Sequence, residues 1–144
     1  MTRIPPEIIK ASIKPGSVYY FREENIQSSD KHYFVVINRN PQTDEIILLV
    51  CASSQIAHVK LIYKNCSPKT LVIIKPEEYS GFRVPSIFNC NNIFRKSIEL
   101  IMKKYESNEL LIRPEMDPKL VDTLRNGVLA SDQIAPRIKS MLRG

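Results

Sequence analysis

Short apolar segments with the period of β-strands occupy the chain up to residue 97, and segments with the period of α-helices follow them. The longest apolar run, residues 46–52, has the length of a strand and falls well below the roughly 18 residues that a membrane span needs. Because strands and helices do not alternate, a parallel sheet of βαβ units is excluded. The pattern indicates an α+β chain that is mostly β, a small, strongly bent β-barrel or half-barrel with C-terminal helices.

The expected strands are separated by turn-forming segments. They lie at residues 17–22, 32–38, 45–52, 70–75 and 86–94. The second is apolar almost throughout, which is typical of a strand buried on both faces. The cluster of turn residues at 39–44 predicts an antiparallel hairpin between the second and third strands. Residues 56–63 fit either a strand or irregular structure.

The last third of the chain carries helix signals. Ser97 and Asp117 are N-cap residues, and proline follows Asp117 at the first helical position. Residues 109–113 fit a last short strand, and Pro136 fits the start of a final helix. We therefore expect a barrel with an N-terminal arm at residues 1–105 and a helical extension packed on it at residues 106–144.

The charge of +6 is unevenly distributed. Residues 1–105 contain 15 Lys and Arg against 9 Asp and Glu, whereas residues 106–144 contain 6 of each kind. The whole excess therefore lies in the expected barrel, which carries any surface that binds an anionic partner.

Several classes of protein are excluded or disfavoured by what the sequence lacks. The first ten residues contain no hydrophobic signal region, and three cysteines are an odd number, so we expect a cytoplasmic protein without a disulfide framework. Two histidines and no CxxC pair argue against a zinc site. No GxSxG, HExxH or nucleotide-binding motif occurs, so no metal, cofactor or membrane partner is expected.

Two pairs of polar residues at strand ends are candidates for chemistry. Lys31 and His32 open the second strand, where imidazole can transfer a proton and lysine can neutralise a phosphate. The alternative is a solvated lysine beside a histidine that only bonds its neighbours. Ser53 and Ser54 follow the third strand, where hydroxyls can bind a phosphate oxygen or form an ordinary turn.

Asparagines and aromatic residues form a second group of candidates. Asn91 and Asn92 can border a base-binding pocket, although Asx-turns are the simpler account of the 89–92 segment. Cys90 lacks a cationic neighbour in the sequence, which favours an inert buried thiol over a nucleophile. Tyrosines interleaved with Lys31, Arg39 and Arg83 can stack on bases of single-stranded nucleic acid or fill a small core.

In order along the chain, these segments resemble MazF/PemK-type toxins. The sequence KPGSVYYF at 14–21 is similar to the opening strand of that family, and KHYFVVIN at 31–38 to its strand led by a basic residue. The segment VCASSQI at 50–56 matches a third strand that ends in Thr or Ser. The segments EY at 78–79 and PSIF at 85–88 resemble the turn and strand that follow. The resemblance covers about residues 14–95.

The resemblance implies an SH3-like barrel that forms a homodimer and cleaves single-stranded RNA without a metal. In the family the RNA 2′-hydroxyl attacks the adjacent phosphorus, and a small acidic antitoxin protein is the partner. By position, the catalytic residues are His32, with Lys31 before it, and Ser53. The expected RNA-binding residues are Ser54, Arg39, Arg83, Asn91 and Asn92, together with the 23–31 loop.

One departure from the family leaves two functions open. The family has arginine where this chain has His32, and imidazole does not reproduce the planar fork of a guanidinium. Either His32 acts as acid or base while Lys31 supplies the charge, or the barrel is a non-catalytic module that binds nucleic acid or protein. An enzyme unrelated to RNA that uses Cys90 is the third hypothesis.

Overall fold

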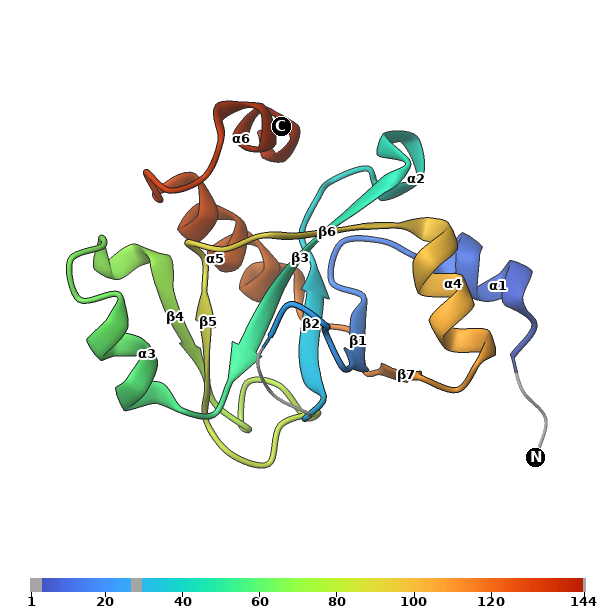
Figure 1. Ribbon diagram of the computed structural model, residues 1–144, viewed down its shortest axis with the longest axis horizontal. Helices are drawn as coiled ribbons and strands as arrows, with labels where there is room; N and C mark the ends of the chain where they lie inside the picture. Colours follow the sequence, from blue (N-terminus) through green and yellow to red (C-terminus); the bar gives the residue numbers. More distant parts are fainter. Residues whose placement is uncertain (1–3, 27–29, 144) are drawn as a thin grey trace.

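The strands form one antiparallel sheet in the computed structural model, which describes residues 4–26 and 30–143. Their order is β4-β5-β3-β2-β1-β7, and β6 pairs with β3 beside β5 (Figure 1). In the described residues the sheet is not closed, so of the two expected forms the half-barrel is the one found. The strands are β1 (Val18–Phe21), β2 (His32–Val36), β3 (Ile46–Ser53), β4 (Leu71–Ile74), β5 (Ser86–Asn89), β6 (Phe94–Ser97) and β7 (Leu110–Arg113).

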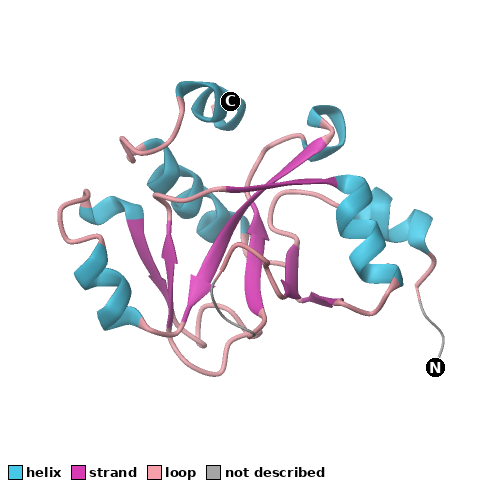
Figure 2. Ribbon diagram, viewed as in Figure 1, coloured by secondary structure: helices cyan, strands magenta, loops and turns pink. Residues whose placement is uncertain are grey.

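The helices lie around this sheet (Figure 2). They are α1 (Pro6–Ser12), α2 (Pro41–Asp44), α3 (Ile56–Ile62), α4 (Ile98–Glu106), α5 (Pro118–Leu129) and α6 (Pro136–Leu142), with a 3-10 turn at Pro68–Thr70. Both predicted N-caps are confirmed: Ser97 Oγ accepts from the Leu100 amide at 3.1 Å, and Asp117 accepts from the Lys119 amide at 2.8 Å. No helix in the described part of the chain is long and apolar enough to cross a membrane.

The prediction of a single strand at residues 86–94 is wrong, because the chain forms two strands there, β5 and β6, which both pair with the central strand β3. One edge of β3 pairs with β2, and the other pairs first with β6 and then with β5. Between β5 and β6 the chain turns, because the Asn89 side chain accepts from the Asn91 amide at 3.1 Å in an Asx-turn. The amide side chain therefore divides the segment into two strands.

Residues 56–63, for which a strand or irregular structure was expected, form the helix α3 instead. Its partly buried positions Ile56, Val59 and Tyr63 are spaced as one side of a helix. The helix has no fully buried residue, and Leu61 and Ile62 are exposed. This loose packing explains why the apolar pattern of the segment is ambiguous.

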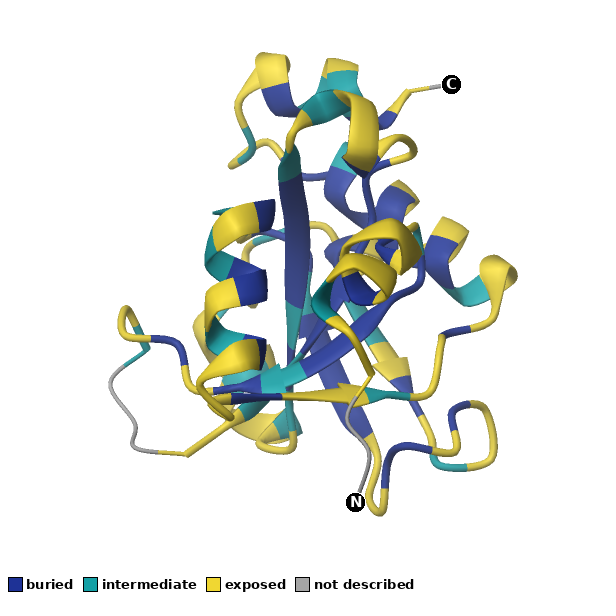
Figure 3. Ribbon diagram, turned by 90° about the vertical axis from the view of Figure 1, so that its right-hand side faces the viewer, coloured by how far each residue is buried: buried dark blue, intermediate teal, exposed yellow. Residues whose placement is uncertain are grey.

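Two hydrophobic clusters lie on the two faces of the sheet. One contains Val35 and Ile37 together with buried residues of α5 and α6, and the other contains Phe34 and Val36 together with residues of α1 and α4. Alternate residues of β2 and of the position after it thus enter different clusters, which confirms that this strand is buried on both faces. In Figure 3 the buried residues, in dark blue, run along strands of the sheet.

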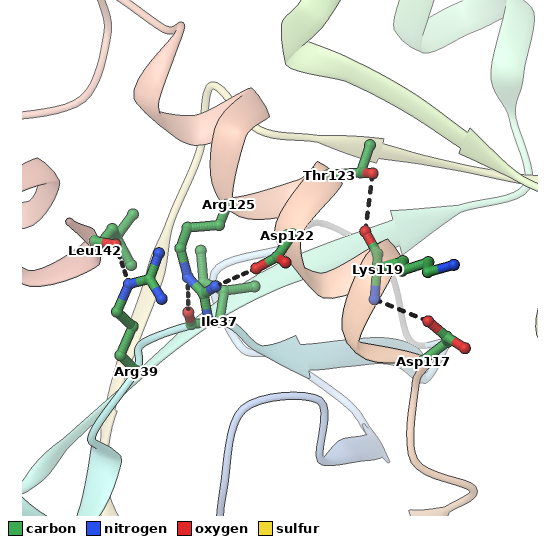
Figure 4. A network of polar contacts seen from close by, with 8 residues as sticks. All are labelled: Ile37, Arg39, Asp117, Lys119, Asp122, Thr123, Arg125 and Leu142. Carbon is green, nitrogen blue, oxygen red and sulfur yellow. Dashed lines mark hydrogen bonds and ion pairs between the residues drawn. The ribbon is translucent and has the colours of Figure 1, made fainter. Parts of the chain in front are cut away.

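The C-terminal helices are bonded to the far end of β2. Arg125, buried in α5, donates from Nε to the carbonyl of Ile37 at 2.9 Å, and Arg39 donates from Nε to the carbonyl of Leu142 at 2.9 Å (Figure 4). Strand β7 follows residue 105 and pairs with β1 along its full length. The division of the chain at residue 105 stays a prediction.

Candidate functional site

The residues of the candidate site come from adjacent ends of β2 and β3. The printed register pairs Phe34 with Cys51 and Val35 with Val50. Extending this antiparallel register by two residues places His32 opposite Ser53, so their side chains point to the same face of the sheet. The strand pairing therefore brings together two residues that are 21 positions apart in the sequence.

A cleft of about 540 Å³ opens at these strand ends. Five of the predicted site residues line it: Lys31, His32, Ser53, Ser54 and Arg83. Ile26 and Asp30 also line it from the expected 23–31 loop, of which residues 27–29 lie outside the described part of the chain. Lys31 and Arg83 are exposed, so two cations face the solvent at a cleft lined mainly by polar groups.

His32 and Ser53 are both half-buried and have different hydrogen-bonding states. The Ser53 Oγ accepts from the Gln55 amide at 3.1 Å, which is the expected turn chemistry, and its own O–H is left to donate. The Nδ1 atom of His32 is buried without a hydrogen-bond partner among the described residues. No carboxylate in the described segments therefore accepts a hydrogen bond from this nitrogen.

Three other predicted RNA-binding residues have different positions. Asn92 lines a cavity of about 200 Å³ that also contains His32 and Ser53, so it borders the same site. Asn91 is buried away from the cleft, where it donates to Thr70 at 2.9 Å and accepts from Ser131 at 2.7 Å. Arg39 is bonded to the C-terminal helix at the opposite end of β2, and it does not line the cleft.

The buried thiols do not have the environment of a nucleophile. Burial raises the pKa of Cys90 to about 12, and burial together with the charge of Glu23 raises the pKa of Cys51 to about 12. A thiol with such a pKa is almost entirely protonated at neutral pH and reacts slowly. The structure therefore gives no support to an enzyme that uses Cys90.

The structure adds two cleft residues that the sequence did not indicate. His58 is exposed on α3, and Tyr20 is half-buried on β1; both line the cleft. His58 could not be found from the sequence because the helix that carries it was not predicted. Tyr20 belongs to the tyrosines that were considered together for base stacking or core packing, and nothing in the sequence singled it out. Among the described residues, no group of three or more His, Cys, Asp or Glu could hold a metal ion.

No protein-family model matches the chain, and no curated protein is significantly similar to it. Solved structures are similar to it. One is described as an endoribonuclease in complex with its cognate antitoxin from mycobacterial species. It matches with a TM-score of 0.50 and 12% identity over 81% of this chain and 91% of that chain.

The chain has the fold of a toxin endoribonuclease. This match confirms the α+β fold class and shows a fold shared with the toxin of a toxin–antitoxin pair. The SH3-like barrel stays a prediction. At 12% identity the likeness establishes the fold alone. The activity must therefore be argued from the cleft.

Proposed function

We propose that the protein is a toxin-like endoribonuclease that cleaves single-stranded RNA by metal-independent attack of a 2′-hydroxyl on the adjacent phosphate. The observation that carries this proposal is that His32 and Ser53, at adjacent ends of β2 and β3, line one cleft together with Lys31 and Arg83. Two cations against the one carboxylate of Asp30 leave the cleft with an excess of positive charge that attracts the phosphodiester. A histidine and a hydroxyl in the same cleft can supply proton transfer and a hydrogen-bond donor.

In this proposal each group has one task. His32 takes the proton from the 2′-hydroxyl, whose oxygen then forms a bond to phosphorus. Ser53 donates its O–H to a non-bridging phosphate oxygen, and the ammonium of Lys31 stabilises the negative charge of the transition state. The bond from phosphorus to the 5′-oxygen breaks, which leaves a 2′,3′-cyclic phosphate and a free 5′-hydroxyl.

The departing 5′-oxygen needs a proton as well. The chain contains two histidines, and both line this cleft, His32 from β2 and His58 from α3. We assign the second proton transfer to His58, which donates to the 5′-oxygen as the bond breaks. A pair of histidines thus supplies the base and the acid that replace the arginine of the family.

The first test is cleavage of a labelled single-stranded RNA by the purified protein in the presence of EDTA. We expect fragments with a cyclic phosphate and a 5′-hydroxyl, identified by mass spectrometry. His32→Ala is expected to lower the rate about 100-fold or more, since a positioned proton-transfer group contributes about 10²–10⁴-fold. His32→Ala is also expected to abolish growth arrest when the protein is expressed in cells.

The control is Arg39→Gln, because Arg39 is a cation at the opposite end of β2 and does not line the cleft. It is expected to cleave at the rate of the unmodified protein. RNA that stays intact, together with arrest that survives in His32→Ala, contradicts the catalytic proposal. Salt-sensitive RNA binding without cleavage would instead establish the non-catalytic module.

We also propose that a small acidic protein is the partner and that the chain forms a homodimer. The similar mycobacterial endoribonuclease was solved in complex with its cognate antitoxin. The test is co-expression with the acidic protein encoded by an adjacent reading frame. The complex is expected to be isolated intact and to lack RNA cleavage, and light scattering of the chain alone is expected to give the mass of two copies.

A further inference from the structure

A second, smaller pocket adjoins the candidate cleft and has a different composition. It has a volume of about 340 Å³ and is lined by Tyr20, Tyr33, Arg83, Leu111 and Arg113. Three of these residues, Tyr20, Tyr33 and Arg83, also line the cleft. The pocket is therefore the next position along the same surface.

The strand register builds the aromatic wall of this pocket. Tyr20 is opposite Tyr33 across the β1–β2 pair and opposite Leu111 across the β1–β7 pair, so the three side chains form one row on one face of the sheet. The ring centroids of the two tyrosines are 4.6 Å apart. Tyr33 is held by its O–H, which donates to the Gly81 carbonyl at 3.1 Å, and by an edge contact with Phe82 at 5.1 Å.

The charged wall consists of two guanidinium groups. Arg83 is exposed and Arg113 is half-buried, and neither belongs to an ion pair within residues 4–26 and 30–143. The Nε atom of Arg113 is buried and has no hydrogen-bond partner among the described residues. Arg83 and Arg113 together bring two positive charges to the lining of the pocket, and a guanidinium group is well suited to bind an anionic ligand.

We propose that this pocket binds one nucleotide of the RNA next to the cleavage position, with its base on Tyr20 and its phosphate on Arg83 and Arg113. A flat aromatic ring beside two cations suits a nucleotide, because the base can stack on the ring while its phosphate binds the cations. A sugar or an apolar ligand has no phosphate and would leave the two cations unused. Stacking accepts any base, so the pocket adds affinity and position without reading sequence. The identification of the ligand as RNA rests on the proposed function.

The test measures binding without cleavage. A fluorescent single-stranded RNA of about ten nucleotides, with every 2′-hydroxyl methylated, cannot undergo the attack, so its anisotropy reports affinity alone. We expect Tyr20→Ala to weaken binding at least about fivefold and Tyr20→Phe to bind within about twofold of the unmodified protein, because phenylalanine keeps the stacking surface. Arg113→Gln is expected to weaken binding and to reduce its dependence on salt.

The matched control is Arg137→Gln, which removes the same charge from an exposed position on α6. It is expected to leave the affinity unchanged. If Tyr20→Ala and Arg113→Gln bind as tightly as Arg137→Gln and have unchanged circular dichroism, the nucleotide pocket is refuted. This binding measurement does not depend on cleavage. If the unmodified protein fails to cleave ordinary RNA, the proposed function is refuted, but the binding result for the pocket still holds.

A measurement on the unmodified chain covers the case in which Tyr20→Ala does not fold. The RNA is made with 4-thiouridine at each position in turn, irradiated with the protein, and digested for mass spectrometry. We expect a cross-link to Tyr20 or Tyr33 from at least one position. Cross-links confined to other peptides overturn the proposal.

Discussion

At the scale of single residues, the proposed chemistry of the cleft depends on His32, which stands where the MazF/PemK-type toxins that the sequence resembles have arginine. Five residues selected from the sequence, Lys31, His32, Ser53, Ser54 and Arg83, line the cleft, because each stands at or near a strand end and strand ends meet. Their roles toward RNA stay a prediction. The sequence was insufficient for Arg39 and Asn91, whose side chains bond to the C-terminal part of the chain. Contacts between such distant segments leave no local pattern in a sequence.

The role assigned to His58 can be tested through the leaving group. A uridine 3′-(4-nitrophenyl) phosphate releases nitrophenolate, which needs no proton, whereas RNA releases an alkoxide that does. We expect His58→Ala to cleave RNA about 100-fold more slowly and the nitrophenyl ester at nearly the unmodified rate. His32→Ala should slow both substrates, since both need removal of the 2′-proton.

Lys60→Ala provides the control on the same helix, because Lys60 is exposed and does not line the cleft. It is expected to cleave both substrates normally. An equal loss for RNA and for the nitrophenyl ester in His58→Ala would exclude proton donation by His58 and would indicate a role in binding instead.

At the scale of elements, α5 is a helix with a glycine near its C-terminal end, and the packing of the helix explains that residue. A Cβ at Gly127 would lie 2.8 Å from the Sγ of Cys90 and 3.0 Å from the carbonyl oxygen of Lys69. The absence of a side chain lets α5 lie directly against two segments, the one that leads into β4 at Lys69 and the one that leaves β5 at Cys90. Helix propensity by itself would favour alanine at this position by about 1 kcal/mol.

We therefore expect Gly127→Ala to lower the free energy of unfolding, although helix propensity alone would raise it. Overpacking of this kind costs about 1–3 kcal/mol, which exceeds the gain in helix propensity. Urea denaturation followed by circular dichroism measures the change. Adding Cys90→Ala to Gly127→Ala removes the Sγ and should recover part of the lost stability. The control is Asn126→Ala, one position earlier, which measures the general effect of alanine in α5.

At the scale of the whole molecule, the sequence predicted the order of most elements because their apolar periods are local. It did not predict how the sheet is shared between two cores. That sharing depends on β1, β2 and β3 each contributing alternate residues to opposite faces, with α1 and α4 on one side and α5 and α6 on the other. The boundary expected at residue 105 stays a prediction, and β7, which lies beyond it, pairs with β1 at the end of the sheet.

A shared sheet implies that neither core can open while the other stays intact, and two thiols allow this to be measured. Cys90 belongs to the cluster with α5 and α6, and Cys51 packs against the cluster with α1 and α4. Burial raises the pKa of both thiols to about 12, so at about pH 8 both are protonated and unreactive in the folded protein and become reactive when it unfolds. We expect mass spectrometry to find both labelled at the same urea midpoint, as two-state unfolding requires. Labelling of Cys90 at a lower urea concentration than Cys51 would contradict this expectation. It would mean that the C-terminal helices detach first, and it would support the expected division of the chain into barrel and extension.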